Sequence, residues 1–245
     1  MNRKRADLLL VERGLFDSRA KARAAIEAGR VVAGGETVRR PADLLDEDIE
    51  IVAEPAHPWV GRAALKLAHA LEVWPIRVEG RHVLDVGAST GGFTEVCLAR
   101  GASHVVAVDV GRGQLHPRLS GDPRVTSLEA TDARSLTQVQ VGVCDLVVCD
   151  VSFISLSKAL PNPLALAAPG ADLVCLVKPQ FEVGPGRVGK GGLVKDAAAQ
   201  ADAVQGVRAF LAEAGWTVQG EADSPIAGGD GNREILLWAT KKPSA

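Results

Sequence analysis

Two residues of opposite charge each end an apolar run of this chain. Asp150 follows residues 145–149, and Lys178 follows residues 173–177 and precedes Pro179. A charge at the tip of an apolar strand is costly to bury without a partner. The proline biases Lys178 toward an extended backbone, so that its side chain projects from the strand edge. Either residue alone could be structural, but an acid and a base that end neighbouring strands favour a catalytic pair.

A glycine-rich turn adds a candidate cofactor site. Residues 83–94 have the sequence VLDVGASTGGFT, an apolar run containing Asp85 and then a turn that opens a helix. Such a strand–turn–helix unit holds a nucleoside cofactor at the carboxyl edge of a parallel sheet. The next apolar run ends at Asp109, 24 residues after Asp85 (109 − 85), about where a ribose-binding carboxylate belongs. The predicted cofactor-binding residues are Asp85, Gly87, Ser89, Thr90, Gly91, Gly92, Phe93 and Asp109.

The glycine spacing indicates the kind of cofactor. A dinucleotide fold uses G-x-G-x-x-G, whereas Gly87 begins the pattern G-x-x-x-G-G. Asp85 would repel a pyrophosphate but tolerates the cationic sulfonium and ammonium of S-adenosylmethionine. The turn alone fits any βαβ unit equally well; with Asp109 it favours a methyltransferase over a nicotinamide dehydrogenase. Asp132, shortly after the run 125–128, could accept a hydrogen bond from an adenine amino group, with an ordinary loop aspartate as the alternative.

The composition is that of an ordinary globular protein. The 245 residues are 47% hydrophobic and 24% charged, with a formal net charge of −2, so any nucleic-acid-binding surface must be local. We find no metal-ligand spacing, signal peptide or membrane-spanning run, and therefore expect a cytoplasmic protein with no metal and no membrane association. The cysteines are predicted to be free, buried thiols: Cys97, Cys144, Cys149 and Cys175.

The chain divides into two predicted modules joined by a proline-marked linker at 55–60. Residues 1–54 have the pattern of a small α+β domain. Its helices are expected over 5–13 and 18–29, and its strands at 31–32, 37–38 and 49–52.

The second module, residues 61–245, is predicted to be an α/β, Rossmann-like methyltransferase sheet. Short apolar runs alternate with helical segments, as in a buried parallel sheet. Strands are expected at 82–86, 104–109, 145–149 and 172–177, and helices over 61–72, 92–100, 155–168 and 196–214. A closing antiparallel pair at 216–221 and 234–240 is typical of methyltransferases rather than of dehydrogenases.

Basic residues gather near the N-terminus. Residues 1–30 hold eight basic residues against four acids, whereas 41–54 hold six acids and no base. A basic helix can bind phosphates or be simply a solvated face. The segments 8–11 (LLLV), 18–22 (SRAKA) and 26–32 (IEAGRVV) resemble the S4 domain, which presents its basic second helix to structured RNA. That resemblance implies RNA contacts from Arg3, Lys4, Arg5, Arg19, Lys21 and Arg23.

Lys66 and Glu234 become candidate site residues when they are considered together with Asp150 and Lys178. Lys66 lies off the apolar face of its helix and Glu234 opens the last strand, so each alone would be a solvated or an edge residue. Together the four match the K-D-K-E set of the FtsJ-type RNA 2′-O-methyltransferases. The matching segments are 62–67 (RAALKL), 149–153 (CDVSF), 177–182 (VKPQFE) and 231–234 (GNRE).

With its S4-like segment, the whole chain resembles the TlyA (haemolysin A) family of ribosomal RNA methyltransferases. The resemblance implies transfer of a methyl group from S-adenosylmethionine to the 2′-hydroxyl of a cytidine, in ribosomal RNA or a ribosomal subunit. The chain departs from many relatives at the linker, where His57-Pro58 replaces a basic residue and Gly61-Arg62-Ala63 replaces Ser-Arg-Gly. How RNA docking is coupled to the cofactor site through this linker stays open.

The hypothesis for the reaction assigns a role to each charged residue. A ribose hydroxyl must lose its proton as it attacks, and only a neutral lysine can accept that proton. Lys178 is the predicted general base, with the nearby cation Lys66 and partial burial favouring its neutral form. Asp150 would orient the amine, and Glu234 would hold Lys66 or the incoming ribose.

A glycine-rich basic segment at 184–192 lacks the Walker spacing. It is predicted to be a cationic loop that closes over RNA, with a plain flexible connection as the alternative. Arg62, Arg187 and Lys190 are the predicted RNA contacts of this module. Two other functions stay open, a non-catalytic RNA-binding assembly factor and a membrane-lytic protein, although no long amphipathic basic helix supports lysis. The modified nucleotide and the oligomeric state are not predicted.

Overall fold

The computed structural model describes residues 2–243, and the chain divides into two compact units, Met1–Pro58 and Trp59–Ala245. The outermost residues of the two predicted modules, Met1, Ser244 and Ala245, lie outside the described residues.

The N-terminal unit packs two helices against short strands. Its elements are β1 (Arg3–Arg5), α1 (Ala6–Glu12), α2 (Arg19–Glu27), β2 (Val31–Ala33), β3 (Glu36–Thr37), β4 (Leu44–Asp46) and β5 (Ile51–Ala53). The hydroxyl of Ser18 accepts a hydrogen bond from Lys21 N–H and begins α2. Gly29, with φ +68°, follows its end. Both predicted helices are confirmed. Strands β1 and β4 were not expected; Arg3–Arg5, which forms β1, has no alternation of polar and apolar residues.

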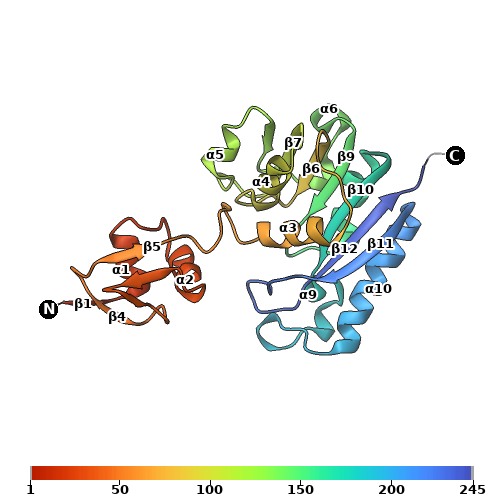
Figure 1. Cartoon of the computed structure of the whole chain (residues 1–245). Helices are drawn as coiled ribbons and strands as arrows, with labels where there is room; N and C mark the ends of the chain where they lie inside the picture. The colour runs from red at the N-terminus through yellow and green to blue at the C-terminus, as the bar shows by residue number, and fades with distance from the viewer. Residues whose placement is uncertain (1, 244–245) are drawn as a thin grey trace. The chain divides into compact units, whose positions relative to one another are not determined.

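The C-terminal unit is built on a seven-stranded sheet in the order β11-β12-β10-β9-β6-β7-β8 (Figure 1). Its strands are β6 (His82–Val86), β7 (His104–Val108), β8 (Val125–Leu128), β9 (Cys144–Cys149), β10 (Ala167–Val177), β11 (Trp216–Asp223) and β12 (Ile235–Lys241). Strands β6 to β10 pair in parallel, whereas β12 pairs antiparallel with both β10 and β11. The predicted parallel strands and closing antiparallel pair are confirmed.

Helices and short turns connect these strands. They are α3 (Ala64–Val73), α4 (Gly92–Ala99), α5 (Pro117–Ser120), η1 (Ala133–Ser135), α6 (Gln138–Val141), α7 (Leu156–Ala159), α8 (Pro161–Ala165), α9 (Pro179–Glu182), η2 (Pro185–Arg187), η3 (Lys190–Gly192) and α10 (Ala197–Glu213). The single helix predicted over 155–168 was wrong. Two short helices, α7 and α8, stand there, because Pro161 cannot continue the first of them and instead begins the second.

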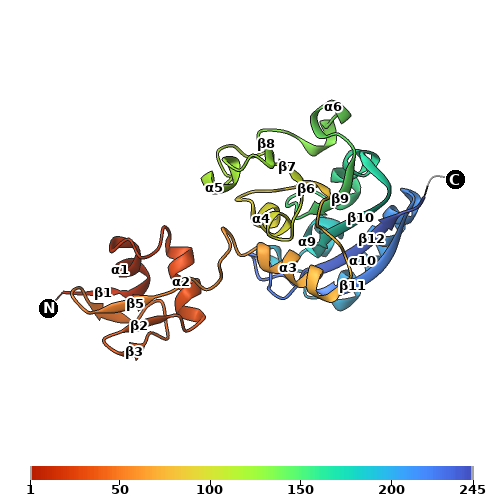
Figure 2. The same cartoon turned by 45° about the horizontal axis from the view of Figure 1, so that its top comes forward.

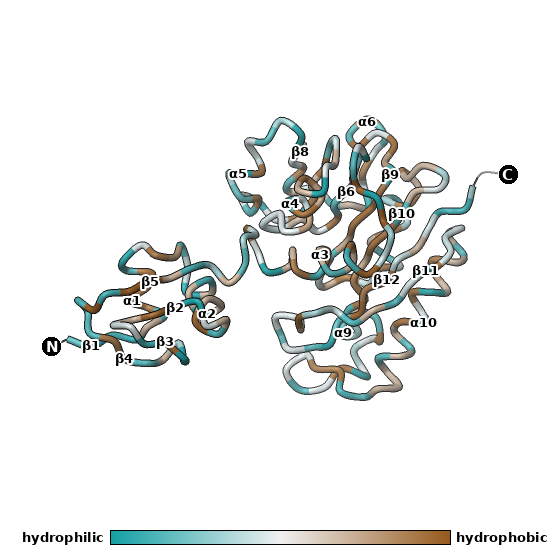
Figure 3. The backbone as a smooth tube through the Cα atoms, viewed as in Figure 1, coloured by the Kyte–Doolittle hydropathy of each residue, from teal (hydrophilic) through white to brown (hydrophobic). Residues whose placement is uncertain are grey.

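The sheet has a hydrophobic core on each face. Leu84 of β6 belongs to the core that includes α7, α8 and α10, whereas its neighbour Val83 belongs to the core that includes α3 and α4. Successive strand residues point to opposite faces, so a strand buried on both faces is apolar throughout. Figure 3 shows this as hydrophobic stretches along the central strands, and Figure 2 shows the same strands side by side in a second view.

The strand order decides where chemistry gathers. Strands β6 and β9 are neighbours at the centre of the sheet. Strands β7 and β8 follow β6 on one side, whereas β10 and then β12 lie beyond β9 on the other side. Ligands in such sheets bind at the carboxyl ends of the strands where the order reverses. Asp109, Asp150 and Lys178 directly follow β7, β9 and β10, so all three lie at this edge.

Candidate active site

The turn after β6 depends on close backbone contacts. Gly87 has φ +84°, and a Cβ at this position would lie 2.9 Å from the carbonyl oxygen of Asp150. Gly91, with φ +94°, precedes α4, and a Cβ there would collide with Leu119. Glycine at position 87 lets the ends of β6 and β9 approach each other, and glycine at position 91 leaves room for Leu115 and Leu119.

Asp109 holds the other side of this turn. Its Oδ2 accepts a hydrogen bond from Ser89 N–H at 2.8 Å, and its Oδ1 accepts one from Gly111 N–H at 2.7 Å. Ser89 has φ +47°, an unusual conformation for a non-glycine residue. Each carboxylate oxygen keeps capacity for a further donor, so Asp109 can support the turn and still receive a ribose hydroxyl.

A cavity of about 560 Å³ lies at the ends of β6, β7 and β9. Gly87 and Ser89 line it together with the carboxylates of Asp109, Asp132 and Asp150. In the part of the chain that the structure describes, Arg134 is the single basic residue in this lining. The volume is that of a small-molecule site, and the excess of carboxylates fits the cationic S-adenosylmethionine and opposes a pyrophosphate.

The remaining predicted cofactor residues lie outside the lining of this cavity. Asp85 is completely buried, and its Oδ2 accepts a hydrogen bond from the Thr94 hydroxyl at 2.6 Å. Burial raises the pKa of Asp85 to about 7. The predicted cofactor residues that do not line the cavity are Asp85, Thr90, Gly91, Gly92 and Phe93. Asp132 does line the cavity, where its carboxylate accepts hydrogen bonds from Arg134.

The four K-D-K-E residues converge although they are far apart in the sequence. Lys66 Nζ lies 3.3 Å from Asp150 Oδ2 and 2.6 Å from Glu234 Oε2, and Lys178 Nζ lies 2.6 Å from Asp150 Oδ1. Asp150 therefore bridges the two lysines. We call these four residues the tetrad.

The tetrad is buried, with side-chain exposures between 3% and 11%. With both lysines protonated, the two ammonium groups and two carboxylates sum to zero formal charge. Each buried charge is therefore stabilised by the opposite charges beside it. The alternatives of a solvated Lys66 and an exposed edge Glu234 do not apply, because both side chains are buried. Sequence periodicity misses this because the compensating charges come from other elements of the fold.

Two polar residues near the tetrad were not among the sequence candidates. Ser152 Oγ accepts a hydrogen bond from Lys178 Nζ at 2.9 Å. Asn232, 3% exposed, accepts from Val194 N–H and donates to the carbonyl of Gly192, joining the 190–194 segment to the turn before Glu234. Their positions within two residues of Asp150 and Glu234 were the available signal.

Most predicted RNA contacts of the N-terminal unit take part in ion pairs. Arg5 and Arg19 both bind Asp7. The other pairs are Arg3 with Asp46, Lys4 with Glu12 and Glu47, and Lys21 with Asp17. Arg23 is exposed on α2. The pairs of Arg3, Lys4 and Lys21 are exposed and weak, so they leave these cations available to a phosphate. Arg5 and Arg19 hold a buried carboxylate, but their guanidinium groups are themselves partly exposed.

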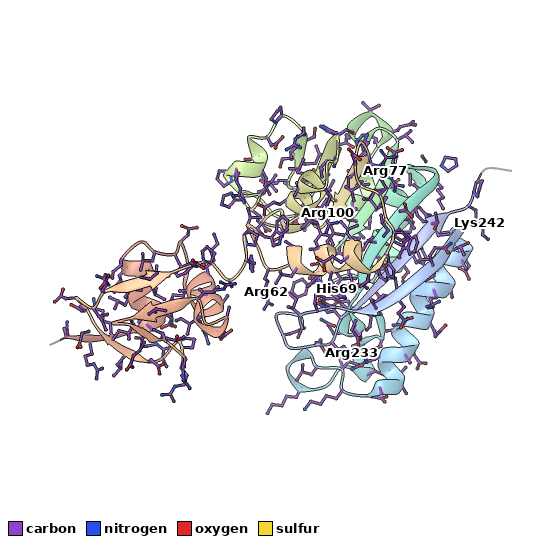
Figure 4. The ribbon with its side chains drawn as sticks, viewed as in Figure 1. Arg62, His69, Arg77, Arg100, Arg233 and Lys242 are labelled. Atoms are coloured by element: carbon purple, nitrogen blue, oxygen red, sulfur yellow. The ribbon has the colours of Figure 1, made fainter. Side chains whose placement is uncertain are left out.

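The predicted RNA contacts of the C-terminal unit are exposed but separate. Figure 4 shows Arg62 near the start of α3, and its Nη2 would lie 3.3 Å from a Cβ placed on Gly229, in the turn that precedes Glu234. Arg187 instead pairs with Asp202 of α10 at 2.6 Å. Lys190 is exposed in η3.

Residues 2–243 contain no candidate metal centre and no candidate membrane span. No cluster of three or more His, Cys, Asp or Glu side chains there is arranged to hold a metal ion. No helix within that range is both long and apolar enough to cross a membrane.

The strand order, the glycine turn and the tetrad define a Rossmann-like, S-adenosylmethionine-dependent methyltransferase. The FtsJ-like methyltransferase family matches residues 59–241, and the S4 domain matches residues 4–51. The chain thus belongs to the FtsJ-like methyltransferases that carry an N-terminal S4 domain, and within them to the TlyA family.

Individual relatives support this assignment. The chain is 49% identical over 239 residues to the 16S/23S rRNA (cytidine-2′-O)-methyltransferase TlyA of Mycobacterium tuberculosis, covering 96% of this chain and 89% of the relative. It is 42% identical over 239 residues to YqxC of Bacillus subtilis, named as an rRNA methyltransferase candidate, covering 96% and 85%. A solved structure of a candidate hemolysin from Streptococcus thermophilus has a TM-score of 0.78 and 39% identity, covering 100% of this chain and 90% of that one.

Proposed function

We propose that this protein methylates the ribose 2′-hydroxyl of a cytidine in ribosomal RNA. The observation that carries the proposal is the tetrad, which places Lys178 and Asp150 beside a cavity suited to S-adenosylmethionine. The named activity of the Mycobacterium tuberculosis relative supports the substrate. Ribosomal RNA, free or within an assembling subunit, is the proposed partner, and the cytoplasm the proposed location.

The bound cofactor supplies an electrophilic methyl group on a sulfonium. The chain's own residues then position and deprotonate the ribose hydroxyl. Lys178 acts after the resting ammonium has released one proton to solvent; its neutral amine then receives the hydroxyl proton as the oxygen forms its bond to the methyl carbon and the C–S bond breaks. Asp150 holds that amine, and Glu234 holds Lys66 against Asp150, so the acceptor has one fixed position.

An aromatic pair, formed by the exposed Phe153 at the cavity and the half-buried Phe181, suits the target base. Phe153 is 92% exposed, lines the cavity and has φ +66°. Its ring lies 5.3 Å from that of Phe181, centroid to centroid. Exposing so large an apolar ring is unfavourable without a partner, and nucleobases extruded for chemistry stack on aromatic side chains. We assign the pair to holding the base while its ribose faces Lys178.

The test is methyl transfer to bulk ribosomal RNA with mapping of 2′-O-methylated positions. We expect the wild-type chain to modify a cytidine, and Lys178→Ala to lose transfer by about 100-fold or more while calorimetry finds nearly unchanged S-adenosylmethionine binding. A Lys242→Arg variant, which keeps the charge of an exposed cation beyond the far end of β12 from Glu234, serves as the control. Equal loss of transfer and cofactor binding in Lys178→Ala would refute the proposed division of roles.

Two alternative functions give different results in the same experiments. An RNA-binding assembly factor would bind ribosomal RNA and S-adenosylmethionine without methylating any ribose. A membrane-lytic protein would release dye from liposomes, and we expect no release.

A further inference from the structure

The amine of Lys178 contacts two oxygen atoms of one short segment. Nζ lies 2.6 Å from Asp150 Oδ1 and donates a hydrogen bond to Ser152 Oγ at 2.9 Å. Ser152 lies two residues after Asp150 and also lines the cavity. The general base is thus held from two directions next to the cofactor.

The hydrogen bond to Ser152 limits the directions in which a neutral Lys178 amine can point its lone pair. A neutral lysine has two N–H groups and one lone pair in a roughly tetrahedral arrangement. If Asp150 and Ser152 each accept one N–H, the lone pair must point in the remaining direction, away from both acceptors. With Asp150 alone, the amine could rotate about the Cε–Nζ bond and aim its lone pair elsewhere.

We propose that Ser152 is a positioning residue that, together with Asp150, aims the lone pair of Lys178 at the 2′-hydroxyl of the substrate. This inference rests on the proposed function. The O–H bond of the ribose breaks and its proton joins Nζ, while the oxygen forms a bond to the methyl carbon and the C–S bond electrons leave with sulfur. The resulting ammonium keeps its ion-pair contact with Asp150 and its hydrogen bond to Ser152, and directs a further N–H at the new ether oxygen.

The surroundings of Ser152 separate this role from a structural one. Ser152 is exposed, so water can replace its hydroxyl as a hydrogen-bond partner and the contact contributes little to folding. The following residue, Phe153, keeps a backbone conformation with φ +66° that costs free energy for a non-glycine residue. The segment therefore keeps the Ser152 hydroxyl beside Lys178, although this hydrogen bond contributes little to the stability of the fold.

The test compares Ser152→Ala with Ser152→Thr in the full chain. We expect Ser152→Ala to lower kcat for RNA methylation by about 10- to 100-fold, with KM for RNA, S-adenosylmethionine affinity and melting temperature unchanged. Ser152→Thr keeps a hydroxyl and should recover most of kcat. Ser155→Ala is the matched control, because the Ser155 hydroxyl contacts that of Ser157 at 3.2 Å rather than Lys178.

Either of two results would overturn the inference: a Ser152→Ala enzyme with kcat within twofold of wild type, or an equal loss in Ser152→Ala and Ser152→Thr. Failure of the inference differs from failure of the proposed function. In the first case the wild type methylates ribose and Lys178→Ala does not, while Ser152→Ala remains active. In the second case the wild type itself methylates no ribose.

Discussion

Each unit of this protein buries an aspartate completely, with opposite effects on its charge. Asp7 in the N-terminal unit accepts hydrogen bonds from Arg5 at 3.0 Å and Arg19 at 2.9 Å, and these guanidinium groups lower its pKa to about 2. Asp85 in the C-terminal unit accepts one from the Thr94 hydroxyl, and burial raises its pKa to about 7. Both carboxylates are closed to solvent, but Asp7 has two guanidinium partners near the surface whereas Asp85 lies deep in the core with one hydroxyl partner, so their pKa values shift in opposite directions.

The same comparison separates RNA docking from catalysis. The arginines that hold Asp7 are about half exposed, at 41% and 53%, so they can keep this contact and still meet a phosphate. Asp150 is held by lysines that are each 8% exposed. Little water reaches these two ammonium groups, so the ion pairs of Asp150 are preorganised before the substrate arrives.

The largest effect on stability is expected from Lys66→Met. This substitution leaves Glu234 buried without its cation and Asp150 with one lysine, a change that typically costs about 3–5 kcal/mol. Every tryptophan of the chain lies in the C-terminal unit, so denaturation followed by tryptophan fluorescence reports on this unit. The double variant with Glu234→Gln should recover part of the loss; a loss below about 1 kcal/mol would mean that the tetrad behaves like a surface pair.

Asp85→Asn should reveal a pH-dependent cost in the wild type. Between the ordinary aspartate value near 4 and about 7, the folded state keeps a proton that the unfolded chain has lost. The unfolding free energy of the wild type then falls as pH rises, with a slope of up to about 1.4 kcal/mol per pH unit. The stability of Asp85→Asn relative to wild type should rise through this window and level off above it. A pH-independent difference between the two proteins would contradict the raised pKa.

Asp7→Asn should show the opposite trend in the N-terminal unit. The lowered pKa of Asp7 contributes stability that is complete above its ordinary value near 4 and is lost as pH falls toward about 2. At neutral pH we expect a loss of about 1–3 kcal/mol, measured by hydrogen exchange in α1 and α2. The difference from wild type should shrink on acidification, and a difference that grows would rule out the charged pair as its source.

The smallest effect is expected from Arg23→Ala. Removing one exposed cation should weaken RNA binding only a few-fold and reduce the slope of log affinity against log salt by about 1. RNA binding measured over a salt series gives this slope. Lys242→Ala, an exposed cation of the C-terminal unit, is the control, and an identical change in both variants would argue against docking by α2.

The sequence alone predicted those features of the fold that depend on residues close together in the chain. The glycine pattern around Gly87 predicted a tight turn because few other residues tolerate its conformation and its close approach to β9. Apolar runs predicted the parallel strands, and charges at their ends predicted that Asp150 and Lys178 would meet. The single helix predicted over 155–168 was wrong for a local reason as well, because Pro161 begins a helix and cannot continue one.

Other assignments needed the folded chain. The burial of Lys66 depends on partners 84 and 168 positions later (150 − 66 and 234 − 66). Periodicity along α3 gives no information about them. Asp85 carried the right residue type for a cofactor contact, but the packing of α4 against β6 placed it behind the turn.

The amino-acid sequence by itself determined the class of sheet, the family, the glycine turn and the strand-end residues, because each depends on neighbours within a few positions. The tertiary structure alone decided which charges are buried, which carboxylates keep a proton and which hydroxyl steers Lys178. Those properties depend on the distance between groups and on their access to water, and both are set only when remote segments pack together.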